Sequence, residues 1–273
     1  MATGAASMKT RAWNALMAGD LGKTEYLLDR WHPKSKAEAR ERSHYRAKVM
    51  QYGGRWDVAV KILRGAEVEW GTHIGLRCDI IASLYMLKDF YGWEEAAREL
   101  IQDYPAIAPS LSPIARVRTD IFIGKLLEEL GDAAAACQHY EAFSRLSGID
   151  ASDKMVAQAQ ALRLRAFFGL SRLLSIHYRR LVSYEEEWGA HKLTFEVLHG
   201  LMHAEMSLLG LEHGFARLKR VLSMESLSDA EKNLVYFDFL EEALRRNWGA
   251  SQITALEELR PKGSLTQFEI WVE

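Results

Sequence analysis

Three residues between positions 196 and 203 have the types and the spacing of a metal site on a helix. Glu196, His199 and His203 form an ExxH motif followed by an HxxxH spacing, so they fall on adjacent turns of one helical face. A di-iron carboxylate bundle needs a second ExxH motif on another helix, and the sequence contains neither that nor HExxH. Buried structural histidines therefore explain the motif better, and a metal-dependent enzyme using these residues stays the alternative.

The other motifs that mark an active site are absent. The sequence has no G-x-x-x-x-G-K-[ST] or G-x-G-x-x-G loop to hold phosphates, and no G-x-S-x-G nucleophile elbow. Its aromatic residues fall mostly at the apolar spacing of packed helices. These observations predict a protein that is not an enzyme and needs no cofactor.

The composition is that of an ordinary globular chain. Its 35 basic and 37 acidic residues give a formal net charge of −2, which does not favour nucleic acid or an anionic membrane as a partner. No apolar run of about 18 residues exists, so no membrane span is expected. Cys78 and Cys137 lack a CxxC partner and are predicted to be reduced, buried side chains. A cytoplasmic location is the default.

Regularly spaced glycines indicate how the helices of the chain are arranged. Only five prolines interrupt a chain rich in Ala, Leu, Glu and Arg, which predicts an all-α fold. Gly19, Gly54, Gly92 and Gly131 each separate two helical stretches and lie 35, 38 and 39 residues apart. A helical hairpin repeated at this interval is typical of a stacked helical array.

The hairpins resemble tetratricopeptide repeats. In that family the second helix follows a Gly-Asp/Asn-Tyr-type turn, with a small residue three places past the aromatic one. Gly54-Arg55-Trp56 followed by Ala59 fits best, and Gly131-Asp132 with Ala136 fits next. The resemblance covers about residues 8–148, while Arg46 stands where the family expects an apolar residue.

The resemblance implies a scaffold or adaptor that binds a protein or peptide segment on a concave face lined by first helices. Such a groove would bind by equilibrium association, with limited rearrangement. In the register set by Gly54 and Gly131, six polar residues line it and give it a basic-leaning character: His44, Lys48, Gln51, Arg118, Lys125 and Glu128.

The second half of the chain is less regular. One long helix is expected from Met155 to about Ser183, because no strong breaker interrupts it. A further alternative is a transcriptional regulator in which residues 228–273 form the output module, but their five basic and nine acidic residues disfavour duplex binding. The predicted divisions are a disordered leader (1–7), the repeat array (8–148, with a proline-rich loop at 105–113), a divergent helical half (149–250), and a short helix with a possible C-terminal strand (251–273).

Overall fold

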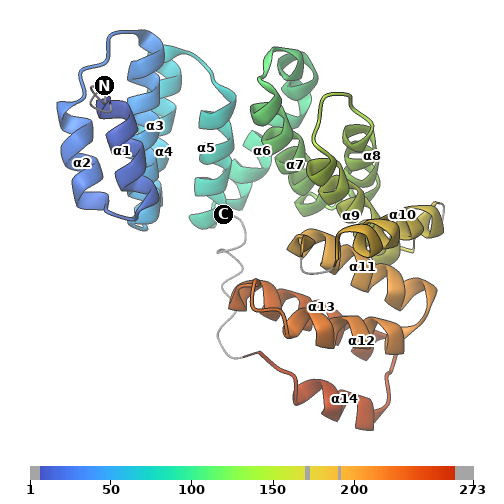
Figure 1. Cartoon of the computed structure of the whole chain (residues 1–273). Helices are drawn as coiled ribbons and strands as arrows, with labels where there is room; N and C mark the ends of the chain where they lie inside the picture. The colour runs from blue at the N-terminus through green and yellow to red at the C-terminus, as the bar shows by residue number, and fades with distance from the viewer. Residues whose placement is uncertain (1–6, 170–172, 190–191, 262–273) are drawn as a thin grey trace, which may run out of the picture. The chain divides into compact units, whose positions relative to one another are not determined.

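The protein is built from helical hairpins, as the glycine spacing predicts. The computed structural model describes residues 7–169, 173–189 and 192–261, and these contain fourteen α-helices and no strand. Consecutive helices pair into antiparallel hairpins (Figure 1). The chain divides into two compact units between Ser112 and Pro113, inside the predicted segment 8–148. The predicted C-terminal strand, and all of the leader except Ser7, lie outside the described residues.

Unit 1 comprises residues 1–112 and holds three hairpins and a short 3₁₀ helix. The first hairpin packs against the next through a small core that includes Leu16, Leu28 and Tyr45. Helix α3 is polar in sequence yet half-buried along most of its length, because it lies among α1, α2 and α4. The helices of unit 1 are α1 (Met8–Met17), α2 (Leu21–Arg30), α3 (Lys36–Tyr52), α4 (Trp56–Trp70), α5 (Ile74–Met86), α6 (Phe90–Ile107) and η1 (Ala108–Ser110).

One turn geometry joins the helices of several hairpins. Gly19, Gly54 and Gly131 have φ values of 71°, 71° and 80°, a left-handed conformation that favours glycine. The residue after each turn glycine donates its backbone N–H to the carbonyl five residues earlier, as in a Schellman motif. The third turn departs from the prediction, because Lys88 adopts the left-handed φ and Gly92 lies inside α6. Asp89 caps that helix by accepting a hydrogen bond from the Gly92 N–H.

Helix α6 also runs past its predicted end at Tyr104. Pro105 lies within the helix, which continues to Ile107 and then tightens into η1, so the predicted loop 105–113 is mostly helical. A proline removes one hydrogen bond of the helix, and Pro105 itself is exposed. The buried side chains of Leu100 and Tyr104 meanwhile hold the last turns against the unit.

Unit 2 comprises residues 113–273 and holds four hairpins. The predicted uninterrupted helix from Met155 to Ser183 is wrong, because the chain leaves α9 after Phe167 and Gly169 adopts a φ of 67°. Gly169 thus lies just after the end of α9, and a second helix, α10, begins at Leu174. The helices of unit 2 are α7 (Pro113–Glu129), α8 (Ala133–Ser144), α9 (Ala151–Phe167), α10 (Leu174–Trp188), α11 (Phe195–Leu208), α12 (Leu211–Leu222), α13 (Asp229–Arg245) and α14 (Ala250–Glu257).

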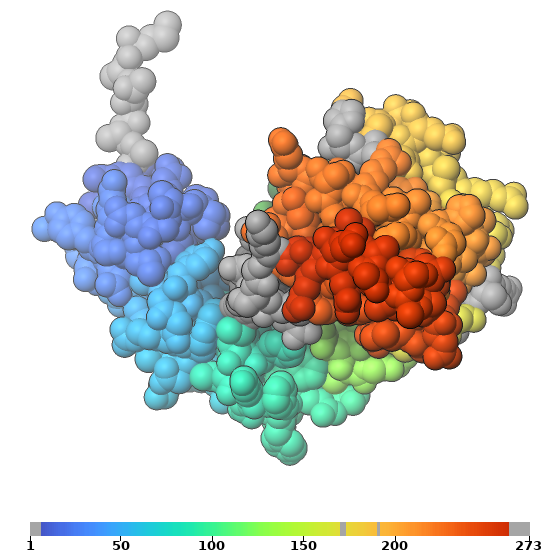
Figure 2. Space-filling view, turned by 90° about the horizontal axis from the view of Figure 1, so that it is seen from below, coloured from blue at the N-terminus to red at the C-terminus, as the bar shows by residue number. Residues whose placement is uncertain are grey.

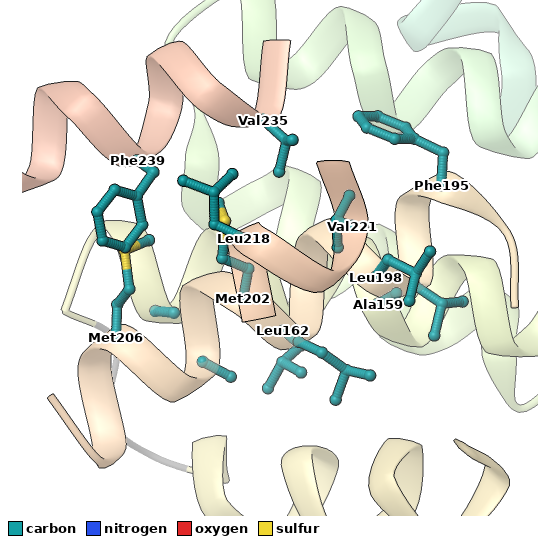
Figure 3. Packing of buried hydrophobic residues seen from close by; sticks show 14 of the residues in the cluster. Ala159, Leu162, Phe195, Leu198, Met202, Met206, Leu218, Val221, Val235 and Phe239 are labelled. Carbon is teal, nitrogen blue, oxygen red and sulfur yellow. The ribbon is translucent and has the colours of Figure 1, made fainter. Parts of the chain in front are cut away.

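Helices α9 and α11 form the centre of the unit 2 core. Small residues let their backbones approach closely, and a Cβ added at Gly200 would lie 2.6 Å from the carbonyl oxygen of Ala159. Leu162, Met202 and Phe239 pack in this core, together with Leu218 from α12 (Figure 3). None of the helices in the described ranges is long and apolar enough to cross a bilayer.

The last hairpin shares this core. Tyr236 and Phe239 of α13 and Leu256 of α14 belong to the same buried cluster as the side chains of α9 and α11. Helix α14, in red, contacts α13, and in the space-filling view it lies in front of the orange helices that precede it (Figure 2). The predicted capping box at Ser228 is present and begins α13. Residues 228–257 are therefore an integral part of unit 2.

Both cysteines are free thiols. Cys137 is buried and Cys78 is partly buried. Burial raises the pKa of each thiol to about 12, so neither is a thiolate at neutral pH.

Candidate functional site

The three groove candidates of unit 1 contact the next first helix. Lys48 Nζ donates a hydrogen bond to Asp79 Oδ1 at 2.7 Å, and His44 Nε2 forms a short hydrogen bond with Asp79 Oδ2. Gln51 Nε2 donates to Ser83 Oγ at 2.9 Å. These side chains from α3 are thus bonded to α5, so they position one first helix against the next.

Asp79 is the centre of this cluster. Burial raises the pKa of its carboxyl group, but the hydrogen bond to His44 and the charge of Lys48 outweigh burial and hold the pKa below its usual range. Asp79 is therefore ionised at neutral pH, and its charge is compensated within the protein.

The stability of unit 1 is expected to depend on this carboxylate. Because the pKa of Asp79 is lower in the folded state than in the unfolded chain, its contribution is complete above about pH 4 and is lost as the pH falls through the folded value. Asp79→Asn should lower the unfolding free energy by about 2 to 3 kcal/mol at pH 7, since a hydrogen bond to a charged group is worth about that much. The loss should be smaller at pH 3. Urea unfolding at both pH values measures this.

Asp29→Asn is the matched control for that experiment. Asp29 pairs with Arg46 but its side chain is 71% exposed, so its removal should change stability by less than about 1 kcal/mol at either pH. Equal effects of the two substitutions at pH 7 would show that the Asp79 cluster is not stabilising.

The groove candidates of unit 2 lie along α7 and differ in their surroundings. Glu128 accepts a hydrogen bond from Tyr140 Oη at 2.9 Å and forms an ion pair with Arg163 of α9. Lys125 is half-buried and has contacts of its own. Arg118 is exposed, and it makes no ion pair with any residue in the described ranges. The two sets of three candidates belong to different units, so a groove spanning both stays a prediction.

A pocket of about 280 Å³ adjoins Arg118 within unit 2. It lies between the start of α7 and the connection from α8 to α9. Its walls combine an aliphatic surface with one basic and two acidic side chains. The lining comprises Pro113, Ile114, Val117, Arg118, Ile121, Gly148, Ile149, Asp150 and Asp153.

The two histidines of the α11 motif lie together, and the acidic residue beside them is Asp238 instead of Glu196. His199 Nε2 lies 2.8 Å from Asp238 Oδ2 and 3.1 Å from His203 Nε2, and the His203–Asp238 distance between the same atoms is 3.5 Å. Asp238 comes from α13, whereas Glu196 is not a member of this group. Sequence reasoning missed Asp238 because it lies 39 residues after His199, and no spacing rule connects them.

The cluster is largely enclosed. His199 and His203 are 5% and 3% exposed, and the rings of Phe195 and Phe167 contact them. Burial lowers the pKa of His199 to about 4, although its hydrogen bond to Asp238 acts in the opposite direction. Burial raises the pKa of Asp238, but the hydrogen bonds from both histidines outweigh this and lower it. At neutral pH the cluster therefore holds a neutral imidazole beside a carboxylate.

Comparison with known proteins identifies the fold. No family model and no curated protein matches this sequence. A tetratricopeptide repeat protein from Parabacteroides merdae superposes with a TM-score of 0.58 at 12% identity, covering 92% of this chain and 96% of that one. This chain has a tetratricopeptide-repeat-like fold.

A quorum sensor has a similar fold. The apo form of NprR from B. thuringiensis matches this tetratricopeptide-like chain with a TM-score of 0.57 at 17% identity, covering 91% of this chain and 72% of that one. NprR in complex with its cognate peptide NprX matches with a TM-score of 0.51 at 15% identity, covering 92% and 75%. The predicted all-α repeat fold is thus confirmed, and it extends beyond residue 148.

Proposed function

We propose that this tetratricopeptide-like chain is a non-enzymatic protein that binds a peptide or an extended protein segment. The observation that carries the proposal is the pocket beside Arg118, where an aliphatic surface adjoins an exposed guanidinium on the first helix of a hairpin. The peptide complex of the similarly folded NprR supports this proposal by analogy of fold.

The pocket has the properties of a subsite for one anchoring side chain. Ile114, Val117 and Ile121 recur at helical spacing along α7, and Ile149 faces them from the α8–α9 connection. Burying an aliphatic side chain there contributes about 0.8 kcal/mol per CH₂ group. Because most of this wall lies on a helix, binding requires little rearrangement.

The charged side chains that line the pocket determine which peptide groups it favours. The planar guanidinium of Arg118 can bind a carboxylate through two parallel hydrogen bonds, which suits an acidic side chain or a peptide C-terminus. Asp150 and Asp153 also line the pocket and favour a basic residue elsewhere in the ligand. We therefore expect ligands that combine an aliphatic residue with a nearby carboxylate.

A displayed library of random peptides, selected on the full chain, tests this proposal. The affinity of the best peptide, measured by fluorescence anisotropy, is expected to fall at least about tenfold in Arg118→Glu, since a charged pair is replaced by repulsion. Ile114→Ser should weaken binding about fivefold, because the 70% exposed side chain of Ile114 lines the pocket and its loss removes apolar contact area.

Arg179→Glu is the matched control. Arg179 is exposed on α10 and is not part of the pocket, so its reversal changes the net charge equally without touching the proposed subsite. Failure to select any peptide, or equal losses in Arg118→Glu and Arg179→Glu, would contradict the proposal.

A further inference from the structure

We propose that His199, His203 and Asp238 form a Zn²⁺ site that joins α11 to α13. The site is independent of the peptide subsite on α7 and would bind the metal whether or not a peptide is present. Its three ligand atoms all lie within 4.8 Å of one another, and no other set of three metal-binding side chains in the described residues meets that condition.

The separations of the three atoms fit a tetrahedral zinc ion. With zinc–ligand bonds of about 2.0–2.1 Å, two ligands of a tetrahedral site are about 3.3–3.4 Å apart. The observed separations are 2.8, 3.1 and 3.5 Å. A zinc ion therefore needs shifts of only a few tenths of an ångström, which rotation about side-chain bonds supplies.

The helices hold two of the ligands firmly. His199 and His203 lie on successive turns of α11, both are buried, and aromatic rings contact both imidazoles. Asp238 reaches them from α13 and is 28% exposed in its side chain. The partly open side of the cluster thus lies at Asp238, where a water molecule can complete a four-coordinate site.

Surrounding charges permit a dication at this position. Arg163 is the nearby cation, and the electrostatic fields of Asp238 and Glu128 both act on it. Its ion pair with Glu128 compensates its charge, so the carboxylate of Asp238 is left for the metal. Asp238 therefore supplies the negative charge that a bound cation requires at this position.

The donor types select the class of metal. Two imidazole nitrogens and one carboxylate oxygen suit zinc and other borderline transition metals, whereas Mg²⁺ and Ca²⁺ prefer oxygen ligands alone. Three protein ligands leave the fourth position of a tetrahedral zinc ion to water. Such a site would also clamp two successive hairpins together, because its ligands come from α11 and α13.

Metal titration of the full chain tests the site. Protein stripped with a chelator is titrated with Co²⁺, whose visible absorption reports tetrahedral coordination, and Zn²⁺ is then added as a competitor. One equivalent of Co²⁺ should bind and be displaced by Zn²⁺. Asp238→Ala and His203→Asn should each weaken binding at least about 100-fold, the effect expected for loss of a direct ligand. Zinc should also raise the melting temperature of the wild type but not that of Asp238→Ala.

Two control variants separate this ligand set from its alternatives. Glu196→Gln removes the acidic residue of the ExxH motif, and His213→Asn removes an exposed histidine of α12, so both should bind Co²⁺ within about threefold of the wild type. Asp238→Asn preserves the shape of the side chain and serves if Asp238→Ala does not fold by circular dichroism.

Two results would overturn the proposal. Absence of saturable binding below about 100 μM metal would mean that the three residues form only a hydrogen-bonded cluster. A loss in Glu196→Gln as large as that in Asp238→Asn would assign the metal to the ExxH motif instead.

Discussion

Replacing Gly200 by alanine is expected to destabilise unit 2 by about 3 kcal/mol or more, although alanine is the better helix former. A Cβ at this position would lie 2.6 Å from the carbonyl oxygen of Ala159 and 3.2 Å from its Cα. Both are backbone atoms of α9, so no flexible side chain can move aside and the two central helices must separate. Urea unfolding followed by circular dichroism measures the loss.

Gly65→Ala provides the control for this prediction. Gly65 lies in the middle of α4, and a Cβ added there meets no atom within 4 Å. The same substitution should therefore stabilise unit 1 by about 0.5–1 kcal/mol through helix propensity alone. A small effect of the same sign at both glycines would contradict the close approach of α9 and α11.

Replacing Arg217 by methionine is expected to destabilise unit 2 by about 3 to 5 kcal/mol, because it leaves the buried Glu205 carboxylate without its cation and removes one of the two arginines that pair with Glu185. The Arg217 guanidinium of α12 donates to both oxygens of Glu205 at 2.6 and 2.8 Å. It also donates to both oxygens of Glu185 at 2.9 Å. Arg217 thus binds carboxylates from α10 and α11 at once, and chemical unfolding of the variant measures their dependence on it.

A neighbouring arginine and a rescue experiment make this prediction specific. Arg220 also pairs with Glu185, at 3.1 Å, but its side chain is 55% exposed, so Arg220→Met should change stability by less than about 1 kcal/mol. Adding Glu185→Gln and Glu205→Gln to Arg217→Met removes the two carboxylates that have lost Arg217. This change should restore part of the lost stability. No recovery in the triple variant would mean that the loss arises from packing instead.

The hairpin architecture could be predicted from the sequence because its signals are local. Gly19, Gly54 and Gly131 sit at left-handed turns, and these positions favour glycine over any residue with a Cβ. Predictions failed where a residue adopts a conformation that its type does not favour. Lys88 adopts the left-handed φ that glycine was expected to supply, while Pro105 continues a helix that the rest of unit 1 supports.

The candidate sites were only partly predictable, because their other members are distant in sequence. The sequence singled out His199 and His203 from their helical spacing, but Asp238 joins them only through packing of α13 on α11. Asp79 lies 35 residues after His44, about one repeat further along the chain, so only the repeat period connects the two residues in the sequence. Arg118 is a candidate from its position in the repeat. The aliphatic wall beside it includes Ile149 of the α8–α9 connection, which only the folded structure brings next to α7.

Hydrogen–deuterium exchange of the chain with and without its selected peptide tests the proposed function most directly. Peptide binding is expected to slow the exchange of backbone amides at the start of α7 and in residues 148–153, the two segments that line the pocket beside Arg118. Arg118→Glu should abolish this protection, and Arg179→Glu should preserve it. Peptide-dependent protection confined to other helices, or its persistence in Arg118→Glu, would contradict the assignment of peptide binding to this surface.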